Sequence, residues 1–243
     1  YDLEQFANKD AQGFPALDYL LNGIATTNTG ITAMYTTDAS ASARKLYLQA
    51  LVNKMQSKIL TVKEAWGNYK SGFVANTATN AGGSMSVMTN AFMLYYERYV
   101  RAGKIGLPVG AMSGVAAPGL TESYYYPSLS KDLAIAALNS VIAWYDGRGY
   151  NNGADGQGFK DYLTAVATKD NTGKLMADVI STEFAEAKAE LAAMPSPIRD
   201  AVSNNRADVL KVYEQMQQLV PLLKVDMVSA FGISITYTDN DGD

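Results

Sequence analysis

The chain has 243 residues, a formal net charge of −4 and a pI near 4.9, so it lacks the cationic surface that nucleic-acid-binding proteins use. Hydrophobic residues make up 48% and charged residues 18%, which excludes a disordered chain and allows a large apolar core. Cysteine and histidine are both absent, which excludes disulfides, Ser-His and Cys-His catalytic pairs, and zinc sites built on imidazole or thiolate.

The first element in chain order is a short helix, predicted over residues 13–23, with an apolar face and a glycine at each end. Pro15 and Asp18 lie one turn apart in this segment and therefore share one face of the helix.

A much longer helix is predicted after the cap cluster at residues 37–40. Apolar residues recur there at alternating spacings of four and three, which predicts about nine helical turns with a seam like that of a coiled coil. The seam residues are Leu48, Val52, Met55, Ile59, Val62, Trp66, Tyr69 and Phe73. The same spacing returns between Met85 and Tyr99, which predicts a second helix that ends near Gly103.

The rest of the chain alternates between loops and helices. Residues 103–127 are rich in Gly and Pro and predict either a long ordered loop or a domain junction. Helices are predicted over residues 128–147, 159–167, 176–194 and 209–232, the last of them kinked at Pro221. A short extended tail over residues 233–237 follows.

These patterns predict an all-α protein in which long helices pack as antiparallel bundles. No run of apolar residues is long enough to cross a bilayer. The helices fall short of two complete bundles, so we expect partner helices upstream of residue 1.

Three segments carry a resemblance to a known family. They are Gly13–Gly23, the pair Tyr95–Tyr99 and Gly103–Gly110, and Leu222–Asp226, which leads into Asp239–Asp243. In these segments the chain resembles the imelysin-like family (peptidase family M75, which includes iron-regulated surface proteins), and most closely its Bacteroidetes type. The family signature is Gly-x-His-x-x-Glu, and here Gly13 matches it, Pro15 stands at the His position and Asp18 at the Glu position.

The resemblance implies two helical-bundle-like halves that arose by duplication, residues 1–110 and residues 111–243, with a ligand cleft between them near the motif. It also implies export to the cell envelope of a Gram-negative bacterium, in the periplasm or at the outer-membrane surface. A lipid anchor on a cysteine upstream of this chain and a link to iron or haem uptake belong to the same expectation.

The departure from the motif bears directly on catalysis. A His and a Glu one turn apart could supply two metal ligands or an acid–base pair, but Pro15 has neither a donor nor a titratable group. Asp18 keeps a carboxylate, either as a ligand contact in the cleft or as a hydrogen-bonded structural residue. The sequence therefore predicts no metal site at the motif and no catalytic residue.

Charged residues elsewhere have two interpretations. Glu97, Arg98 and Arg101 lie on a tyrosine-rich helix, either as a solvated face with an internal salt bridge or as part of the cleft lining. The C-terminal residues Asp239, Asp241 and Asp243 alternate like the opening of a calcium loop, but the segment given has no bidentate Glu after them.

The resulting hypothesis is a non-catalytic envelope binding or accessory protein without a cofactor. Its partner would be an unidentified small ligand, an iron species or a peptide, and not a nucleic acid. The candidate ligand-binding residues are Gly13, Phe14, Pro15, Asp18, Glu97, Arg98, Arg101 and Asp226. The alternatives are a metallopeptidase of the same family with a metal held without histidine, and a purely structural interaction module.

Overall fold

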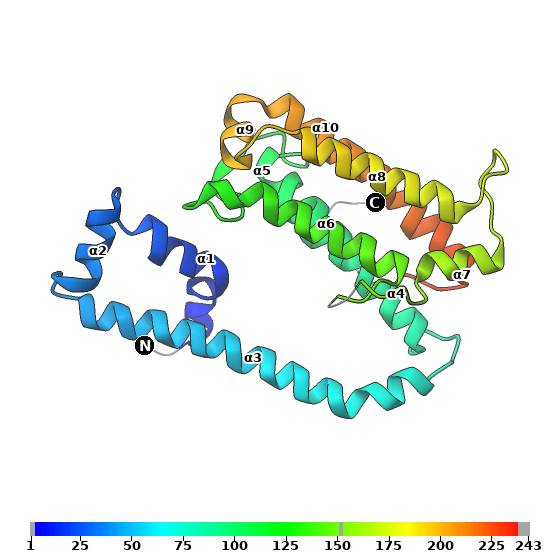
Figure 1. The fold of residues 1–243 in the computed structure, drawn as a ribbon, viewed down its shortest axis with the longest axis horizontal. Helices are drawn as coiled ribbons and strands as arrows, with labels where there is room; N and C mark the ends of the chain where they lie inside the picture. The colour runs from blue at the N-terminus through cyan, green and yellow to red at the C-terminus, as the bar shows by residue number, and fades with distance from the viewer. Residues whose placement is uncertain (1–2, 151–152, 238–243) are drawn as a thin grey trace. The chain divides into compact units, whose positions relative to one another are not determined.

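The computed structural model describes residues 3–150 and 153–237, and all the regular secondary structure in these ranges is helical (Figure 1). The described residues contain no β-strand, only isolated β-bridges at Arg148–Asp155 and Lys169–Leu175. The predicted all-α class is therefore confirmed. The alternating aspartates of residues 239–243 lie outside the described residues.

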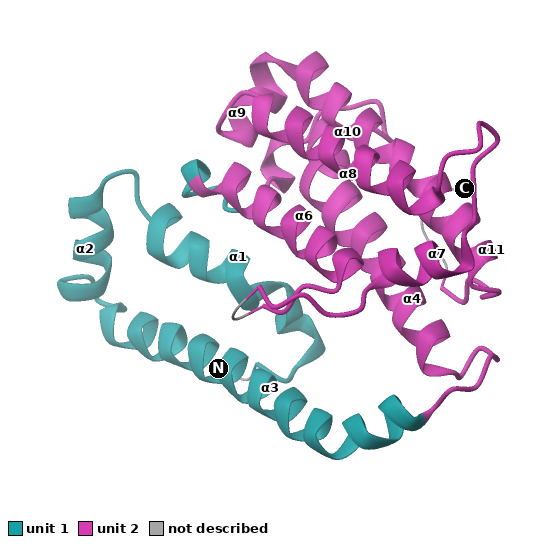
Figure 2. Ribbon diagram, turned by 45° about the vertical axis from the view of Figure 1, so that its right-hand side comes forward, with its two compact units in different colours: residues 1–75, 122–128 teal, residues 76–121, 129–243 magenta. Residues whose placement is uncertain are grey.

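Contacts within the chain divide it into two compact units, drawn in different colours in Figure 2. Unit 1 contains residues 1–75 and 122–128, and unit 2 contains residues 76–121 and 129–243. These units are defined by contacts alone. The expected duplication, with its boundary after residue 110, stays a prediction.

Unit 1 is built around one long helix. Its elements are η1 (Phe6–Ala11), α1 (Gly13–Asp18), the π-helical η2 (Tyr19–Gly23), α2 (Asn28–Thr36) and α3 (Ala41–Ala75). The predicted short helix corresponds to α1 with η2, and the predicted long helix to α3. We did not predict α2, which begins with a capping bond from the Gly30 N–H to the Thr27 hydroxyl (3.0 Å).

The core of unit 1 lies over the first part of α3 only. Leu3, Leu20 and Leu51 are buried together, with residues of α1 and α3 and Ile24 packed around them. Beyond this cluster α3 continues as one unbroken helix, cyan in Figure 1. From residue 56 to residue 75 every position except Phe73 is exposed. The sequence predicted the length of this helix, and its second half has no cover among the described residues of unit 1.

Unit 2 contains the larger core. Its main elements are α4 (Ser84–Leu94), η3 (Tyr95–Gly106), α5 (Leu107–Val109), η4 (Pro118–Leu120), α6 (Ser130–Asp146), α7 (Phe159–Val166), α8 (Met176–Ala193), α9 (Ile198–Asn204), α10 (Arg206–Pro221), η6 (Leu222–Met227) and α11 (Val228–Ala230). A 3-10 turn, η5 (Pro127–Leu129), leads into α6 across the unit boundary. The predicted helices correspond to α4 with η3, α6, α7, α8 and α10 with η6, whereas α5 and α9 were not predicted.

Local chemistry explains where these helices end. Gly147 follows α6 in the left-handed conformation (φ 76°), which glycine adopts without the steric cost that a Cβ would bring. Regular α-helical structure in α10 ends at Pro221, which has no N–H to donate to the preceding turn. The chain then continues as the π-helical η6, which begins at Leu222, and the predicted kink at Pro221 stays a prediction.

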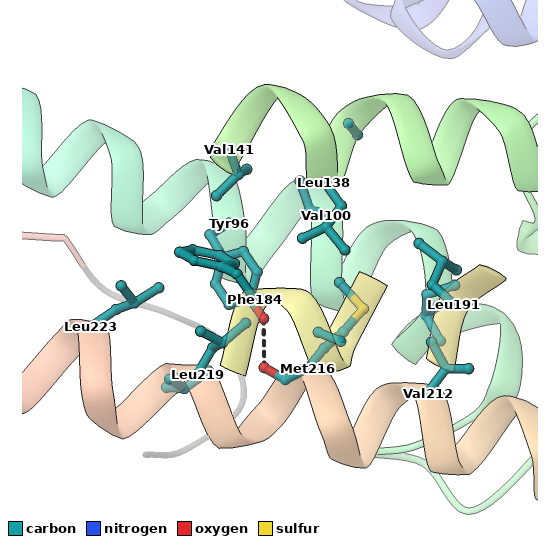
Figure 3. Close-up of a cluster of buried hydrophobic side chains, with 14 of the residues drawn as sticks. Tyr96, Val100, Leu138, Val141, Phe184, Leu191, Val212, Met216, Leu219 and Leu223 are labelled. Carbon is teal, nitrogen blue, oxygen red and sulfur yellow. Dashed lines mark hydrogen bonds between the residues drawn. The ribbon is translucent and has the colours of Figure 1, made fainter. Parts of the chain in front are cut away.

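Four helical segments form a closed ring of contacts around the core of unit 2. Segment η3 packs on α6 and α10, and α8 packs on the same two helices from the other side. Figure 3 shows Tyr96 and Phe184 at the centre of this bundle among aliphatic side chains. The Tyr96 hydroxyl donates a hydrogen bond to the Met216 carbonyl (2.5 Å), and burial raises the pKa of that hydroxyl well above its usual value.

The segment after α11 is tied to α4 through one side chain. The Asn90 amide donates to the Ser234 carbonyl (3.1 Å) and accepts from the Thr236 N–H (2.7 Å). The predicted tail over residues 233–237 therefore forms no strand. The Asn90 side chain instead provides hydrogen-bond partners for two backbone groups of the tail.

Candidate functional site

The motif segment of unit 1 begins with a glycine in a special conformation. Gly13 has φ of 74° and is the first residue of α1. Phe14, which follows it, is exposed over 76% of its surface. Pro15 is also exposed and sits in the first turn, where its missing N–H costs no intrahelical hydrogen bond.

The Asp18 carboxylate is fully engaged within unit 1. Its Oδ1 accepts from the Asn22 side-chain amide (3.1 Å), and its Oδ2 accepts from the Tyr125 N–H (2.8 Å). The Tyr125 ring also packs edge-on against Tyr19, with 5.3 Å between centroids. At Gly23 a Cβ would lie 2.2 Å from the Tyr125 ring, so only glycine allows this close approach. Asp18 therefore links the segment 122–128 to α1.

A second group of candidate residues lies on η3 in unit 2. Glu97 and Arg101 are each exposed over only 1% of their surface, although they are four residues apart on a helical segment. The interpretation of these two residues as a solvated face is therefore wrong. They face α10 and η6 and not solvent, and a charged pair in such a place requires specific partners.

Arg101 is held by side chains of α10. Its Nη1 donates to the Tyr213 hydroxyl (2.7 Å) and to Oε1 of Gln217, and its guanidinium lies 5.3 Å from the Tyr213 ring centroid. Gly106 permits this approach, because a Cβ there would lie 2.7 Å from the Tyr213 ring. The geometry combines hydrogen bonding and cation–π contact, which a lysine would not reproduce.

Lys224 completes the arrangement from η6. Its Nζ lies 3.6 Å from Oε1 of Glu97 and 5.9 Å from the ring centroid of Tyr237. We call Glu97, Arg101, Tyr213, Gln217 and Lys224 the polar cluster. It joins the helical segment before residue 110 to the helix after residue 205, inside one compact unit.

Two further candidate residues, Arg98 and Asp226, lie near the polar cluster in sequence, and their side chains are more exposed to solvent than those of Glu97 and Arg101. Arg98 follows Glu97 on η3 and its side chain is exposed. Asp226 lies on η6 and is half-buried, and this burial raises the pKa of its carboxyl group. Of the eight predicted site residues, the structure thus brings Glu97 and Arg101 into one cluster, and it assigns Gly13, Phe14, Pro15 and Asp18 to the other unit.

Sequence reasoning missed three members of the polar cluster: Tyr213, Gln217 and Lys224. Lys224 could have been found, because it stands inside Leu222–Asp226, one of the segments that carry the resemblance. Tyr213 and Gln217 lie in the helix predicted over residues 209–232, and nothing in the sequence marked either of them as a site residue.

All three segments that carry the resemblance contain π-helical structure. Segment η2 follows the motif, η3 covers Tyr95–Gly106, and η6 covers Leu222–Met227. Such turns are rare and widen the backbone locally, and they occur frequently at functional sites. This shared irregularity singles out the same parts of the chain as the sequence did, on independent grounds.

The described residues contain no group of side chains arranged to bind a metal ion. Nowhere in residues 3–150 and 153–237 do three or more acidic side chains gather closely enough to bind a metal ion together. In the same ranges, no helix combines the length with the apolar composition that a membrane crossing needs.

An open pocket of about 500 Å³ lies elsewhere in unit 2, between α4, α6 and α7. Met85, Trp144, Phe159 and Tyr162 line it, with Arg148 among the polar residues of its wall. None of the predicted site residues contributes to it. The Trp144 side chain, on α6, is 55% exposed.

Comparison with known proteins gives one match. A family model described as Imelysin (peptidase M75) matches residues 2–225, which is most of the chain. Neither a curated protein nor a solved structure matches it.

Proposed function

The chain belongs to the imelysin family, and from this premise we propose that it is a non-catalytic binding or accessory protein of the Gram-negative cell envelope. The observation that carries the proposal is the motif position itself. Pro15 replaces the family's histidine and supplies neither a metal ligand nor a titratable group. The neighbouring carboxylate of Asp18 is engaged in hydrogen bonds that link two parts of unit 1.

The ligand-binding part of the proposal rests on unit 2. Glu97, Arg101 and Lys224 place charges of both signs on π-helical segments, with two of the three side chains almost completely buried. Arg98 is exposed and Asp226 is half-buried on the same two segments, and we infer that these two residues are the ones available to a ligand. A small molecule, an iron species or a peptide would contact these two side chains, and the polar cluster would hold their segments in place.

The link to iron or haem acquisition comes from the family and supplies the probes for a direct test. The thermal unfolding midpoint Tm of the 243-residue chain should rise in the presence of haem, ferric citrate or an unstructured acidic peptide. Arg98→Ala and Asp226→Asn should each reduce that rise, while Lys188→Ala, which alters an exposed cation of α8, should preserve it. No rise in Tm with any of the three probes would refute the binding proposal.

A second prediction concerns catalysis. Protein purified in chelator-free buffer should contain no stoichiometric zinc by elemental analysis, because zinc sites in hydrolases hold at least three protein ligands, usually including histidine. It should also leave an unstructured peptide uncut when cleavage is followed by mass spectrometry. Chelator-sensitive cleavage that Asp18→Ala abolishes would instead establish the metallopeptidase alternative.

A matched variant shows whether the zinc assay is sensitive enough. The double substitution Pro15→His with Asp18→Glu restores the family motif on one face of α1. Both positions are at least partly accessible, so we expect this variant to bind zinc more tightly than the natural chain in a calorimetric titration. Equal zinc binding by the two proteins would show that the residues at positions 15 and 18 do not determine whether this chain binds zinc.

A further inference from the structure

The open pocket of unit 2, about 500 Å³ in volume, is separate from the candidate residues discussed above. Helices α4, α6 and α7 supply its walls, and Figure 2 shows all three at one end of the unit. Its volume lies within the range of about 300–1,000 Å³ that is typical of small-molecule sites. No residue of the motif or of the polar cluster lines it, so it is a second candidate site of the same unit.

The pocket belongs to the unit whose bundle is complete. The ring formed by η3, α6, α8 and α10 closes within unit 2, whereas the long uncovered helix, α3, belongs to unit 1. The upstream helices that the sequence predicts would join the chain at Leu3, which packs in the core of unit 1. The helix face that requires further cover is thus in unit 1 and not at this pocket.

The floor of the pocket is fixed by contacts within unit 2. Gly147 and Gly158 both line the pocket, and a Cβ on Gly158 would lie 2.3 Å from the Gly147 nitrogen, so the two backbone segments touch directly. The Gly158 N–H donates to Oδ2 of Asp161 (2.8 Å), which fixes the first turn of α7. Phe159 is 2% exposed, and its ring lies 5.6 Å from that of Phe231 between centroids. The pocket is therefore preformed, and a ligand would not have to order it.

Two aromatic side chains of the pocket are open to solvent. Trp144 of α6 and Tyr162 of α7 are exposed over 55% and 41% of their surfaces. The Tyr162 ring is held by Phe231, which packs edge-on with 4.8 Å between centroids. Met85 and Met88 of α4 add apolar surface with a flexible outline. Because the face of an aromatic ring is electrically negative, it attracts weakly positive C–H groups, and these walls suit a ligand with C–H groups on one face.

The polar side chains of the pocket carry both signs of charge. Arg148, Gln157 and Asp161 line it beside the aromatic rings. Nη2 of Arg148 lies 3.2 Å from Oδ2 of Asp146, which engages only part of a guanidinium with five N–H donors. A cationic ligand would meet Arg148 and an anionic ligand would meet Asp161, so a net charge of either sign is disfavoured. Hydroxyl groups, which both donate and accept, suit all three side chains.

We propose that this pocket binds a neutral carbohydrate. A sugar ring stacks on Trp144 and Tyr162, and its hydroxyl groups form hydrogen bonds with the three polar side chains of the pocket. A pyranose ring has C–H groups on its face and hydroxyl groups at its rim, which matches apolar walls with polar edges. The site shares no residue with the proposed ligand contacts Arg98 and Asp226, so either proposal can fail without the other.

The fluorescence of Trp144 tests the proposal directly. In a Trp66→Phe variant Trp144 is the remaining tryptophan, and titration with maltose, cellobiose or diacetylchitobiose should change its emission saturably for at least one sugar. Tyr162→Ala and Arg148→Met should each weaken this binding about tenfold. Tyr69→Ala, which removes an aromatic side chain of unit 1 that is 54% exposed, should leave it unchanged. Circular dichroism should show the same helix content in all variants, because these positions are exposed.

Three results would overturn the proposal. One is the absence of a saturable change with any of the three disaccharides. Another is a change that Tyr162→Ala leaves as it is, since the sugar would then bind elsewhere. The third is tighter binding of decanoate or decyltrimethylammonium than of every disaccharide, measured by the same Trp144 signal. That result would assign the pocket to an apolar ligand with a negative or a positive charge.

Discussion

Replacing Arg101 by methionine is expected to lower the free energy of unfolding of unit 2 by about 3–5 kcal/mol. Methionine fills a similar volume but removes the guanidinium, which donates to Tyr213 and Gln217 and lies over the Tyr213 ring. The site is 1% exposed, so water does not replace the lost donor. The Glu97 carboxylate, also 1% exposed, would then remain buried in a cluster with less positive charge.

The chain offers a convenient probe and a matched control for this measurement. It has two tryptophans, Trp66 on α3 and Trp144 on α6, so in a Trp66→Phe background fluorescence reports on unit 2 alone. Arg98→Met makes the same chemical change at the exposed position of the same segment, and should alter stability by no more than about 0.5 kcal/mol. Urea unfolding curves that place both variants within about 1 kcal/mol of each other would show that the polar cluster does not stabilise the bundle.

Replacing Phe184 by alanine should have a comparable effect through a different cause. Phe184 is 1% exposed, with its ring edge-on to Tyr96 (6.1 Å between centroids) and 5.4 Å from Tyr145. Removing the ring leaves a cavity between helices of a closed bundle that can collapse only in part, which costs about 3–5 kcal/mol. The loss should appear in the same urea unfolding experiment.

Two companion variants separate packing from the general effect of losing an aromatic residue. Phe184→Leu keeps most of the buried volume and should cost less than about 1.5 kcal/mol. Tyr150→Ala removes an aromatic side chain that is fully exposed, so its effect should be close to zero. If Phe184→Leu costs as much as Phe184→Ala, the ring contacts and not the filled volume stabilise the core.

The helices of this protein could be predicted where apolar periodicity is sustained over several turns. That holds for α3, α6 and α8, whose ends are also marked by glycine, proline or a polar cap cluster. Three helices, α2, α5 and α9, were not predicted: α2 contains Gly30 and three threonines, which are weak helix formers, and α5 and α9 span only three and seven residues. The π-helical turns could not be predicted, because η2, η3 and η6 share no residue pattern that distinguishes a π-helix from an α-helix.

The candidate site was predictable in part for a similar reason. Glu97 and Arg101 were found from the resemblance, but their burial depends on α10, whose facing residues are more than a hundred positions away in sequence. A charged pair at a spacing of four is usually a surface feature, so spacing alone favours the wrong environment. The missing information was which helix packs against η3, and that is a property of the folded bundle.

The bond between Asp18 and Tyr125 has a consequence for how the polypeptide is threaded. Unit 1 is not one contiguous stretch, because residues 122–128 return to it after the chain has entered unit 2. The backbone therefore passes between the units at three places, after residues 75, 121 and 128. Asp18 and Tyr125 close a loop of 107 positions, and closing so long a loop carries an entropic cost that the contacts in unit 1 must offset.

A fragment that stopped at residue 75 would thus lose the Tyr125 N–H that donates to Asp18 and the Tyr125 ring that packs over Gly23. Protease cleavage within residues 122–128 would sever the same connection without touching either helical core. Each unit therefore consists of two separate stretches of sequence. Neither unit can be excised, or exchanged with that of another protein, as one continuous segment.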